Sequence, residues 1–83
     1  MEVYYTRSAP RDLEALPLQI QKRIATKMRF FIQQPDPLQF AEPLTDRREG
    51  EYRFRIGDYR VIFDVTDGEI YVLKIKKRDE VYQ

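Results

Sequence analysis

Residues 51–83 read EYRFRIGDYRVIFDVTDGEIYVLKIKKRDEVYQ, and this stretch decides the fold of the chain. Apolar or aromatic residues alternate with cations within it, most clearly over residues 52–56. Alternation with a period of two is typical of a β-strand that has one face in the core and the other face exposed. The stretch therefore predicts a sheet with one apolar face and one basic face.

Two tight turns divide this stretch into three strands. Gly57-Asp58 lies between two β-rich runs, with glycine at the first turn position. Asp67-Gly68 is a stronger hairpin signal, because two-residue hairpin turns favour residues that tolerate a positive φ. The turns predict a three-stranded antiparallel meander. Residues 2–6 are also rich in β-forming residues, and we expect this short strand to join the edge of the meander.

The segment between these strands has the periodicity of helices. Ser8 is a candidate N-cap for a short helix that carries Leu13 and Leu16 on one face. A second helix begins near Pro17 and ends before Pro35 and Pro37, which cannot continue it. Its apolar stripe is Ile20, Ile24, Met28 and Phe31, spaced as one buried face. Residues 38–50 are interpreted as a loop, with Leu44 as its anchor in the core.

Strand alternation assigns each side chain of the meander to a face. The predicted core face holds Tyr52, Phe54, Ile56, Tyr59, Val61, Phe63, Tyr71, Leu73 and Ile75. The predicted open face holds Glu51, Arg53, Arg55, Arg60, Ile62, Asp64, Val72, Lys74 and Lys76. The helices must cover the first set. The predicted fold class is α+β, in which a helical hairpin packs on a twisted antiparallel sheet in the order β-α-α-β-β-β, followed by a short C-terminal segment.

Length and composition limit the chemistry that is available. The 83 residues are expected to form one domain, residues 1–83, which buries roughly 60% of its unfolded surface. The chain contains neither cysteine nor histidine, which excludes disulfides, thiolate ligands and imidazole chemistry. We expect no metal site and no cofactor. No apolar run reaches the length of a membrane span, and no signal peptide is recognised.

Charge is distributed unevenly although the net charge is only +1. The cations between residues 53 and 78 are Arg53, Arg55, Arg60, Lys74, Lys76, Lys77 and Arg78. The acids over the same span are Asp58, Asp64, Asp67 and Glu69, most of them in or beside turns. A basic face can therefore exist on a nearly neutral protein, and it suits an RNA backbone. The alternative for each cation is an ordinary solvated face.

Two motifs in this order of elements carry a family resemblance. They are Tyr-x-x-x-x-Gly-x-Tyr-Arg-Val-Ile-Phe, over residues 52–63, and Arg-x-Glu-Val-Tyr, over residues 78–82. Together with the preceding strand, helical hairpin and Pro-containing loop, they make the whole chain resemble the RelE branch of the RelE/ParE toxin superfamily.

The resemblance implies a function and partners. Members of that branch are small cytoplasmic toxins encoded beside an antitoxin, and several cleave messenger RNA in the ribosomal A site. It implies a type II toxin that is a ribosome-dependent, metal-independent endoribonuclease and that binds a cognate antitoxin. The alternatives are a ParE-like toxin that inhibits DNA gyrase without cleaving RNA, and a catalytically degenerate toxin.

The resemblance also places candidate site residues. The family's basic strand positions fall on Arg53 and Arg55, its hairpin arginine on Arg60, and its terminal tyrosine on Tyr82. Its C-terminal basic positions fall on Lys77 and Arg78. We assign Arg60, Lys77, Arg78 and Tyr82 to catalysis, and Arg53, Arg55, Lys74 and Lys76 to RNA binding.

The required chemistry is attack of a ribose 2′-OH on the adjacent phosphate, which needs a base, an acid and cations for the developing charge. Arg60 is assigned to that charge, because guanidinium binds two phosphate oxygens and stays ionised. The chain departs from the family where lysine is often found, at Arg53 and Arg55, and where histidine often precedes the closing arginine. Lys77, crowded by cations that would lower its pKa, becomes the candidate base. Glu51 and Glu80 are the alternative candidates for the base. A further alternative is that no residue acts as a strong base and that positioning in the ribosome provides most of the rate.

Overall fold

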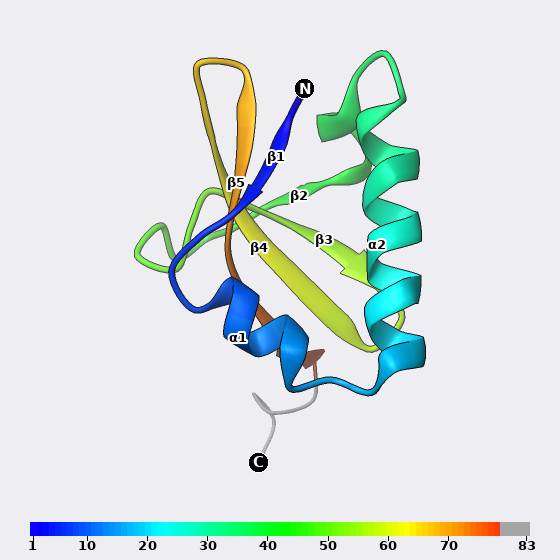
Figure 1. Cartoon of the computed structure of the whole chain (residues 1–83). Helices are drawn as coiled ribbons and strands as arrows, with labels where there is room; N and C mark the ends of the chain where they lie inside the picture. The colour runs from blue at the N-terminus through cyan, green and yellow to red at the C-terminus, as the bar shows by residue number, and fades with distance from the viewer. Residues whose placement is uncertain (79–83) are drawn as a thin grey trace.

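The computed structural model describes residues 1–78 of the chain. Figure 1 shows one sheet with two helices beside it. In chain order the elements are β1 (Val3–Tyr5), α1 (Ala9–Glu14), α2 (Leu18–Ile32), the 3₁₀ helix η1 (Pro37–Phe40), β2 (Glu42–Pro43), β3 (Tyr52–Ile56), β4 (Tyr59–Thr66) and β5 (Glu69–Lys77). The predicted α+β class is confirmed, and the predicted order β-α-α-β-β-β is found with η1 and the short strand β2 added between α2 and β3. Neither α-helix has the length and apolar run that a membrane crossing needs.

The sheet has five strands in the order β1-β5-β4-β3-β2. The predicted antiparallel meander of β3, β4 and β5 is confirmed, and β1 joins its edge as expected. However, β1 pairs with β5 in parallel, with Tyr4 opposite Tyr71, so the sheet is mixed rather than antiparallel. Sequence pattern misses this difference because parallel and antiparallel edge pairing bury the same alternate residues of the strand.

Both hairpin turns form where the sequence predicts them. Gly57 has a φ of 59° in the β3–β4 turn. Asp67 and Gly68, in the β4–β5 turn, have φ values of 52° and 77°. Positive φ at the first central position, as at Gly57, or at both, as at Asp67 and Gly68, matches the twist of the flanking strands. These turns set the register that places particular side chains opposite one another across the sheet.

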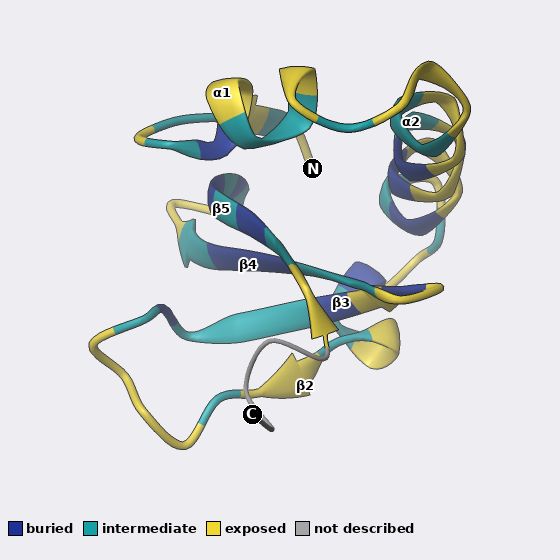
Figure 2. Ribbon diagram, turned by 90° about the horizontal axis from the view of Figure 1, so that it is seen from below, coloured by how far each residue is buried: buried dark blue, intermediate teal, exposed yellow. Residues whose placement is uncertain are grey.

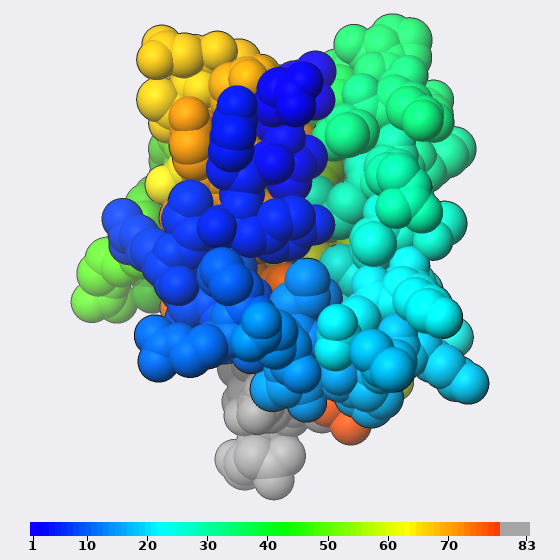
Figure 3. All heavy atoms as spheres, viewed as in Figure 1, coloured from blue at the N-terminus to red at the C-terminus, as the bar shows by residue number. Residues whose placement is uncertain are grey.

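Figure 2 shows both helices on one face of the sheet. α1 packs on β5 and α2 packs on β3. The predicted stripe of α2 is confirmed, because Ile24, Met28 and Phe31 are buried and Ile20 packs against the core. Phe31 stacks on Phe54, with ring centroids 4.3 Å apart. In the space-filling view of Figure 3, the N-terminal half of the chain covers most of the face that is turned to the viewer.

The segment over residues 38–50 is more ordered than the predicted loop. It contains most of η1, and then β2, which pairs antiparallel with β3. Leu38 and Ala41 pack against the core, whereas the predicted anchor Leu44 is not among the residues that do so. The sequence signal was weak because β2 is only two residues long, too short for a visible alternation.

A bulge in β5 overturns part of the predicted division of faces. Ile62 lies opposite Lys74 but Phe63 lies opposite Val72, so Leu73 is an extra residue. Val72 is therefore in the core, and Tyr71 stacks with the exposed Tyr4 instead of facing the helices. A bulge leaves one residue without a cross-strand partner and reverses the alternation beyond it. The predicted core position of Tyr71 and the predicted open position of Val72 were wrong, whereas Leu73 is buried as predicted but lies outside the main core cluster.

Candidate nucleic-acid interface

Five of the predicted cations come together on the sheet face opposite the helices. Register places Arg55, Arg60 and Lys76 side by side in one row across β3, β4 and β5. The neighbouring row has Arg53 and Lys74 on either side of Ile62. We call this set, Arg53, Arg55, Arg60, Lys74 and Lys76, the basic face. Because cross-strand neighbours lie roughly 5 Å apart, the rows concentrate positive charge over three strands.

Arg60 occupies the centre of the basic face. Its residue is half-buried, on the middle strand of the three, between Arg55 and Lys76. The Arg60 Nε is buried and has no hydrogen-bond partner within residues 1–78. A buried donor without a partner costs free energy, and in native structures such groups are uncommon. The position is therefore costly for folding and suited to a ligand that accepts hydrogen bonds.

Glu42, in β2, neutralises one edge of the basic face. Its Oε1 accepts a hydrogen bond from the Arg53 Nε at 2.8 Å and lies 3.4 Å from the Arg55 Nε. Arg53 sits directly opposite Glu42 in the β2–β3 register. The hydrogen bond from Arg53 is the main reason that the pKa of Glu42 is held below its ordinary value.

Glu49 neutralises the opposite edge. Its Oε2 accepts a hydrogen bond from the Lys76 Nζ at 2.7 Å and lies 3.9 Å from the Lys74 Nζ. The hydrogen bond from Lys76 is the main cause of the lowered pKa of Glu49. The adjacent Gly50 is packed so closely on the open face that a Cβ there would lie 2.8 Å from the Ile62 Cγ2. This close approach holds Glu49 beside the lysines.

Sequence reasoning missed both glutamates. The charge count covered residues 53–78, whereas Glu42 and Glu49 precede the meander in the chain. Their only sequence signal was acidity in a segment read as a loop, and nothing in that segment indicated which strand it would approach. The sequence therefore correctly indicated a basic face and overlooked its internal counter-charges.

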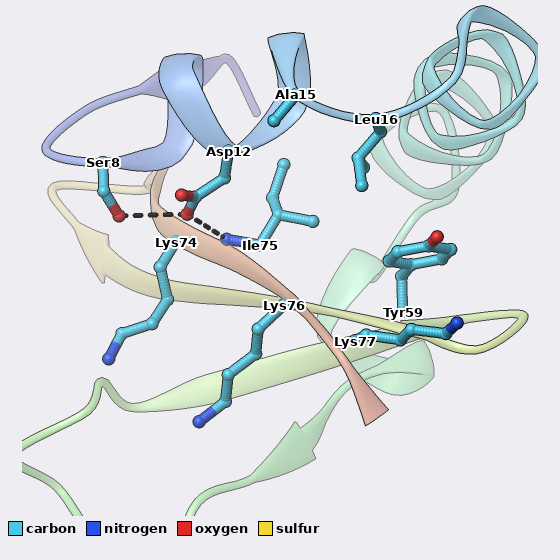
Figure 4. A pocket seen from close by; sticks show the side chains of 9 residues that line it. All are labelled: Ser8, Asp12, Ala15, Leu16, Tyr59, Lys74, Ile75, Lys76 and Lys77. Atoms are coloured by element: carbon cyan, nitrogen blue, oxygen red, sulfur yellow. Dashed lines mark hydrogen bonds between the residues drawn. The ribbon is translucent and has the colours of Figure 1, made fainter. Parts of the chain in front are cut away.

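The C-terminal candidates are placed differently from the basic face. Lys77 is exposed at the end of β5, and Figure 4 shows it extending toward Tyr59, whereas Lys74 and Lys76 point away from α1. The prediction that neighbouring cations crowd Lys77 was therefore wrong for Lys74 and Lys76, whose side chains point in another direction (Figure 4). Arg78 is exposed, and its backbone N–H donates to the Asp58 carbonyl at 2.7 Å, beside the β3–β4 turn. Tyr82 lies outside the described residues.

The reserve bases have other surroundings. The Glu51 Oε1 accepts a hydrogen bond from the Val65 N–H at 2.8 Å, and its Oε2 lies 3.7 Å from the Arg47 Nη2. Glu51 thus has a structural role in joining its loop to β4. Glu80 lies outside the described residues.

A pocket of about 470 Å³ lies on the helix side, between α1 and the end of β5 (Figure 4). The Asp12 Oδ2 accepts hydrogen bonds there from the Ile75 N–H at 2.9 Å and the Ser8 hydroxyl at 3.0 Å. Ser8 occupies the N-cap position of α1, but its side chain makes no capping bond to the helix backbone. The predicted cap is instead a link from the helix to the edge of β5.

The chain is similar to known toxins over almost its whole length. The family model described as the ParE toxin of the type II toxin–antitoxin system, parDE, matches residues 3–82. The chain belongs to the RelE/ParE toxin superfamily. Among curated relatives of this superfamily, Toxin RelE of Mycobacterium tuberculosis is 33% identical over 98% of the chain and 84% of its own length. Toxin RelG of the same organism is 28% identical over 98% of the chain and 94% of its own length.

Solved structures from the RelE/ParE superfamily share the fold. The toxin–antitoxin complex RelBE2 from Mycobacterium tuberculosis matches with a TM-score of 0.74 and 28% identity, over 93% of this chain and 96% of the other. The archaeal RelE–RelB complex from Pyrococcus horikoshii matches with a TM-score of 0.69 and 29% identity, over 95% and 96% of the two chains. Family membership agrees with the resemblance on which the site residues were assigned.

Proposed function

We propose that this RelE/ParE toxin is a ribosome-dependent endoribonuclease that cleaves messenger RNA in the A site without a metal ion. The observation that carries the proposal is the position of Arg60, whose buried Nε lacks a partner within residues 1–78 at the centre of a cationic face. A guanidinium in that setting is suited to a phosphate, whose oxygens accept two parallel hydrogen bonds.

In this reaction the ribose 2′-oxygen attacks the neighbouring phosphorus and the 5′-oxygen of the next nucleotide leaves. The phosphorus gains negative charge on its non-bridging oxygens, and Arg60 stabilises that charge in the transition state. The flanking cations, Arg53, Arg55, Lys74 and Lys76, hold adjacent phosphates and position the scissile one. No covalent enzyme intermediate is needed.

Proton transfer is assigned to the end of β5 and the residues after it. Lys77 is the proposed base. Its exposed side chain is in none of the ion pairs within residues 1–78 and extends toward Tyr59 (Figure 4), so it must turn toward the basic face to reach the 2′-OH. Arg78, two residues after Lys76, is the proposed further phosphate contact, and Tyr82 is proposed to stack on a base or orient the 2′-OH. If Lys77→Ala lowers the cleavage rate by less than tenfold, Lys77 is not the base, and positioning by the ribosome accounts for most of the rate.

We also propose a cognate antitoxin as the partner of this chain. Two structural neighbours were solved as complexes of a Rel toxin with its antitoxin. A segment that covers the basic face of this chain would have to supply acidic side chains. Co-expression of the adjacent open reading frame, followed by co-purification, tests the partnership, and the absence of a stable complex would contradict it.

The test of nuclease function is primer extension on a message translated in a purified system. Wild type and Arg60→Ala are compared with Arg29→Ala, which removes an exposed arginine from the outer surface of α2. We expect discrete cuts within A-site codons for wild type and Arg29→Ala, and a loss of about 100-fold or more for Arg60→Ala. Cleavage that survives in Arg60→Ala would contradict the assigned role.

One observation favours a second function. The family model that matches residues 3–82 is that of ParE toxins. A gyrase inhibitor would stop supercoiling by purified DNA gyrase and would leave translated messages intact. Inhibition of supercoiling without any RNA cut would decide for this function, and cuts without inhibition would exclude it.

A further inference from the structure

Two glutamates engage four of the five cations of the basic face. Glu42 contacts Arg53 and Arg55 on β3, and Glu49 contacts Lys74 and Lys76 on β5. Arg60, on the strand between them, takes part in none of these ion pairs within residues 1–78. The free protein thus holds its own anions on both sides of the central arginine.

The contacts of the glutamates have the chemistry of phosphate contacts. A carboxylate oxygen that accepts from the Arg53 Nε at 2.8 Å, or from the Lys76 Nζ at 2.7 Å, uses the donors that a phosphate oxygen would use. Both anions are bound at the same time, and their cations lie two strands apart. Two strand spacings correspond to about 9.5 Å.

Backbone contacts fix the position of each glutamate. Glu42 is held by the backbone pairing of β2 with β3, directly opposite Arg53. Glu49 precedes Gly50, which is in close contact with Ile62 and near the Leu73 Cδ1. The backbone near each carboxylate is therefore anchored to the sheet, independently of the ion pair itself.

We propose that Glu42 and Glu49 mark two phosphate-binding subsites of the basic face, and that each carboxylate is exchanged for a backbone phosphate when RNA binds. The inference rests on the proposed RNA function. The RNA then crosses the strands from β3 to β5, with the phosphate between the two subsites over Arg60. The carboxylates keep the cations ordered and compete with the substrate.

The ion pairs are exposed enough for such an exchange. The Glu42 and Arg55 side chains each retain 48% of their accessible surface, whereas Arg53, the closer partner of Glu42, retains 22%. The Glu49 and Lys76 side chains retain 33% and 27%, so both pairs are partly open to solvent. Exposed pairs contribute little free energy, so a competing anion with more charge can replace the carboxylate. A released glutamate side chain can turn into solvent while its backbone stays in place.

The experiment measures binding of a short, fluorescein-labelled 2′-O-methyl RNA, which the proposed chemistry cannot cleave, by fluorescence anisotropy over a range of salt concentrations. The variants are Glu42→Gln and Glu49→Gln, which keep the shape of the side chain, and Arg60→Ala, which tests whether the basic face binds the RNA. One control is Glu14→Gln, an exposed α1 residue with the same change in net charge. The other is Asp46→Asn in the loop of Glu49, because the ion pair of Asp46 is with Arg48 and its attraction to Lys74 is only a minor, longer-range one.

We expect each glutamine variant to bind about two- to fivefold more tightly than wild type, because an exposed ion pair no longer competes. The slope of log K against log salt should stay close to that of wild type, since the exchange leaves the same cation–phosphate contacts in the RNA complex of each protein. Both controls should remain within about 1.5-fold of wild type, since neither removes a competitor.

The outcomes separate this inference from the function on which it rests. If binding depends on Arg60 but the two glutamine variants match the controls, the exchange is wrong and the nuclease proposal stands. If either glutamine variant binds RNA more weakly than wild type, the exchange is also wrong. That glutamate then assists RNA binding by orienting the cations. If no protein binds the free RNA, the exchange is wrong, and the ribosome-dependent nuclease proposal is decided by primer extension. If Arg60→Ala binds as wild type does, the basic face is not the RNA site and both proposals fail.

Discussion

The same strands form two chemically different faces of the sheet, one apolar and covered by the helices and the other charged and open. On the covered face Phe54 is fully buried and stacks between Phe31 and Phe63, with ring centroids 4.3 and 4.5 Å away. On the open face its neighbours in sequence, Arg53 and Arg55, contact a single carboxylate near the surface. Alternation in one strand thus places the side chains that stabilise the fold on one face and the charged side chains on the other. A substitution on one face should therefore leave the packing of the other unchanged.

The first way to break this comparison is to remove a large side chain from the covered face. Phe54→Ala should lower the free energy of unfolding by about 3–5 kcal/mol, because a fully buried ring is lost and a cavity is left. Urea denaturation measures the change. The matched control, Arg55→Ala on the open face of the same strand, should cost less than about 1 kcal/mol. Similar losses in both variants would refute the separation of the two faces.

The second prediction concerns the one place where the open face is tightly packed. Gly50→Ala should destabilise the protein by about 1–3 kcal/mol, because its Cβ would lie 2.8 Å from the Ile62 Cγ2. Thermal unfolding measures this change. The control is Gly68→Ala, where φ is +77° and a Cβ would meet no atom within 4 Å, so only the backbone strain of about 1 kcal/mol applies. An equal loss of stability in the two variants would mean that the loop around residue 50 shifts and relieves the contact with Ile62.

The third prediction has the opposite sign. Arg60→Met should raise the free energy of unfolding by about 1 kcal/mol, because it removes a buried donor that lacks a partner within residues 1–78. It should also abolish RNA cleavage if the proposed function holds. Differential scanning calorimetry checks the stability, with Arg29→Met as the exposed control. A lower melting temperature for Arg60→Met would show that Arg60 contributes to the fold.

The smallest expected effect is electrostatic. Lys76→Met should return the pKa of Glu49 toward its ordinary value of 4.5, because the hydrogen bond from Lys76 is the main cause of the lowering. NMR titration of the glutamate carboxyl carbon measures the shift. The pKa of Asp46, lowered mainly by a hydrogen bond from Arg48, serves as the internal control. No change in the pKa of Glu49 would contradict the ion pair.

The sign of the pH dependence follows from that lowered pKa. A carboxylate whose pKa is lower in the folded than in the unfolded protein stabilises the fold above the unfolded pKa. The Glu49–Lys76 contribution is therefore present at neutral pH and is lost as the pH falls below about 4.5, through the folded pKa. Lys76→Met should lack this part of the acid dependence.

Local pattern was sufficient for most of the fold. The apolar stripe of α2, its end before Pro35, and both hairpin turns follow from side-chain periodicity and from backbone conformations that few residues adopt. Each of these signals acts over a few residues, so the sequence contains it directly. The presence of Arg53, Arg55 and Arg60 on one face follows from the same alternation and the two turns.

One failure, the bulge in β5, was local, and the others involve segments that are distant in the chain. Ile70 and Val72 are core residues and Lys74 and Lys76 are exposed to the open face, although an unbroken strand would place all four on one side. That conflict was a readable sign of the bulge at Leu73. The two-residue β2, by contrast, has no pattern of its own and is defined by pairing with β3.

The sequence alone determined the type of β1, α1, α2 and the three strands of the meander, the two turns and the excess of cations in the meander, because these depend on neighbouring residues. Only the tertiary structure decided that β1 joins in parallel, that Asp12 holds the edge of β5, and that Glu42 and Glu49 lie against the basic face. Such contacts depend on where a folded chain brings remote residues within a few ångströms. Charge interactions fall off with distance and with solvent screening, so spatial proximity rather than composition sets the electrostatics of this face.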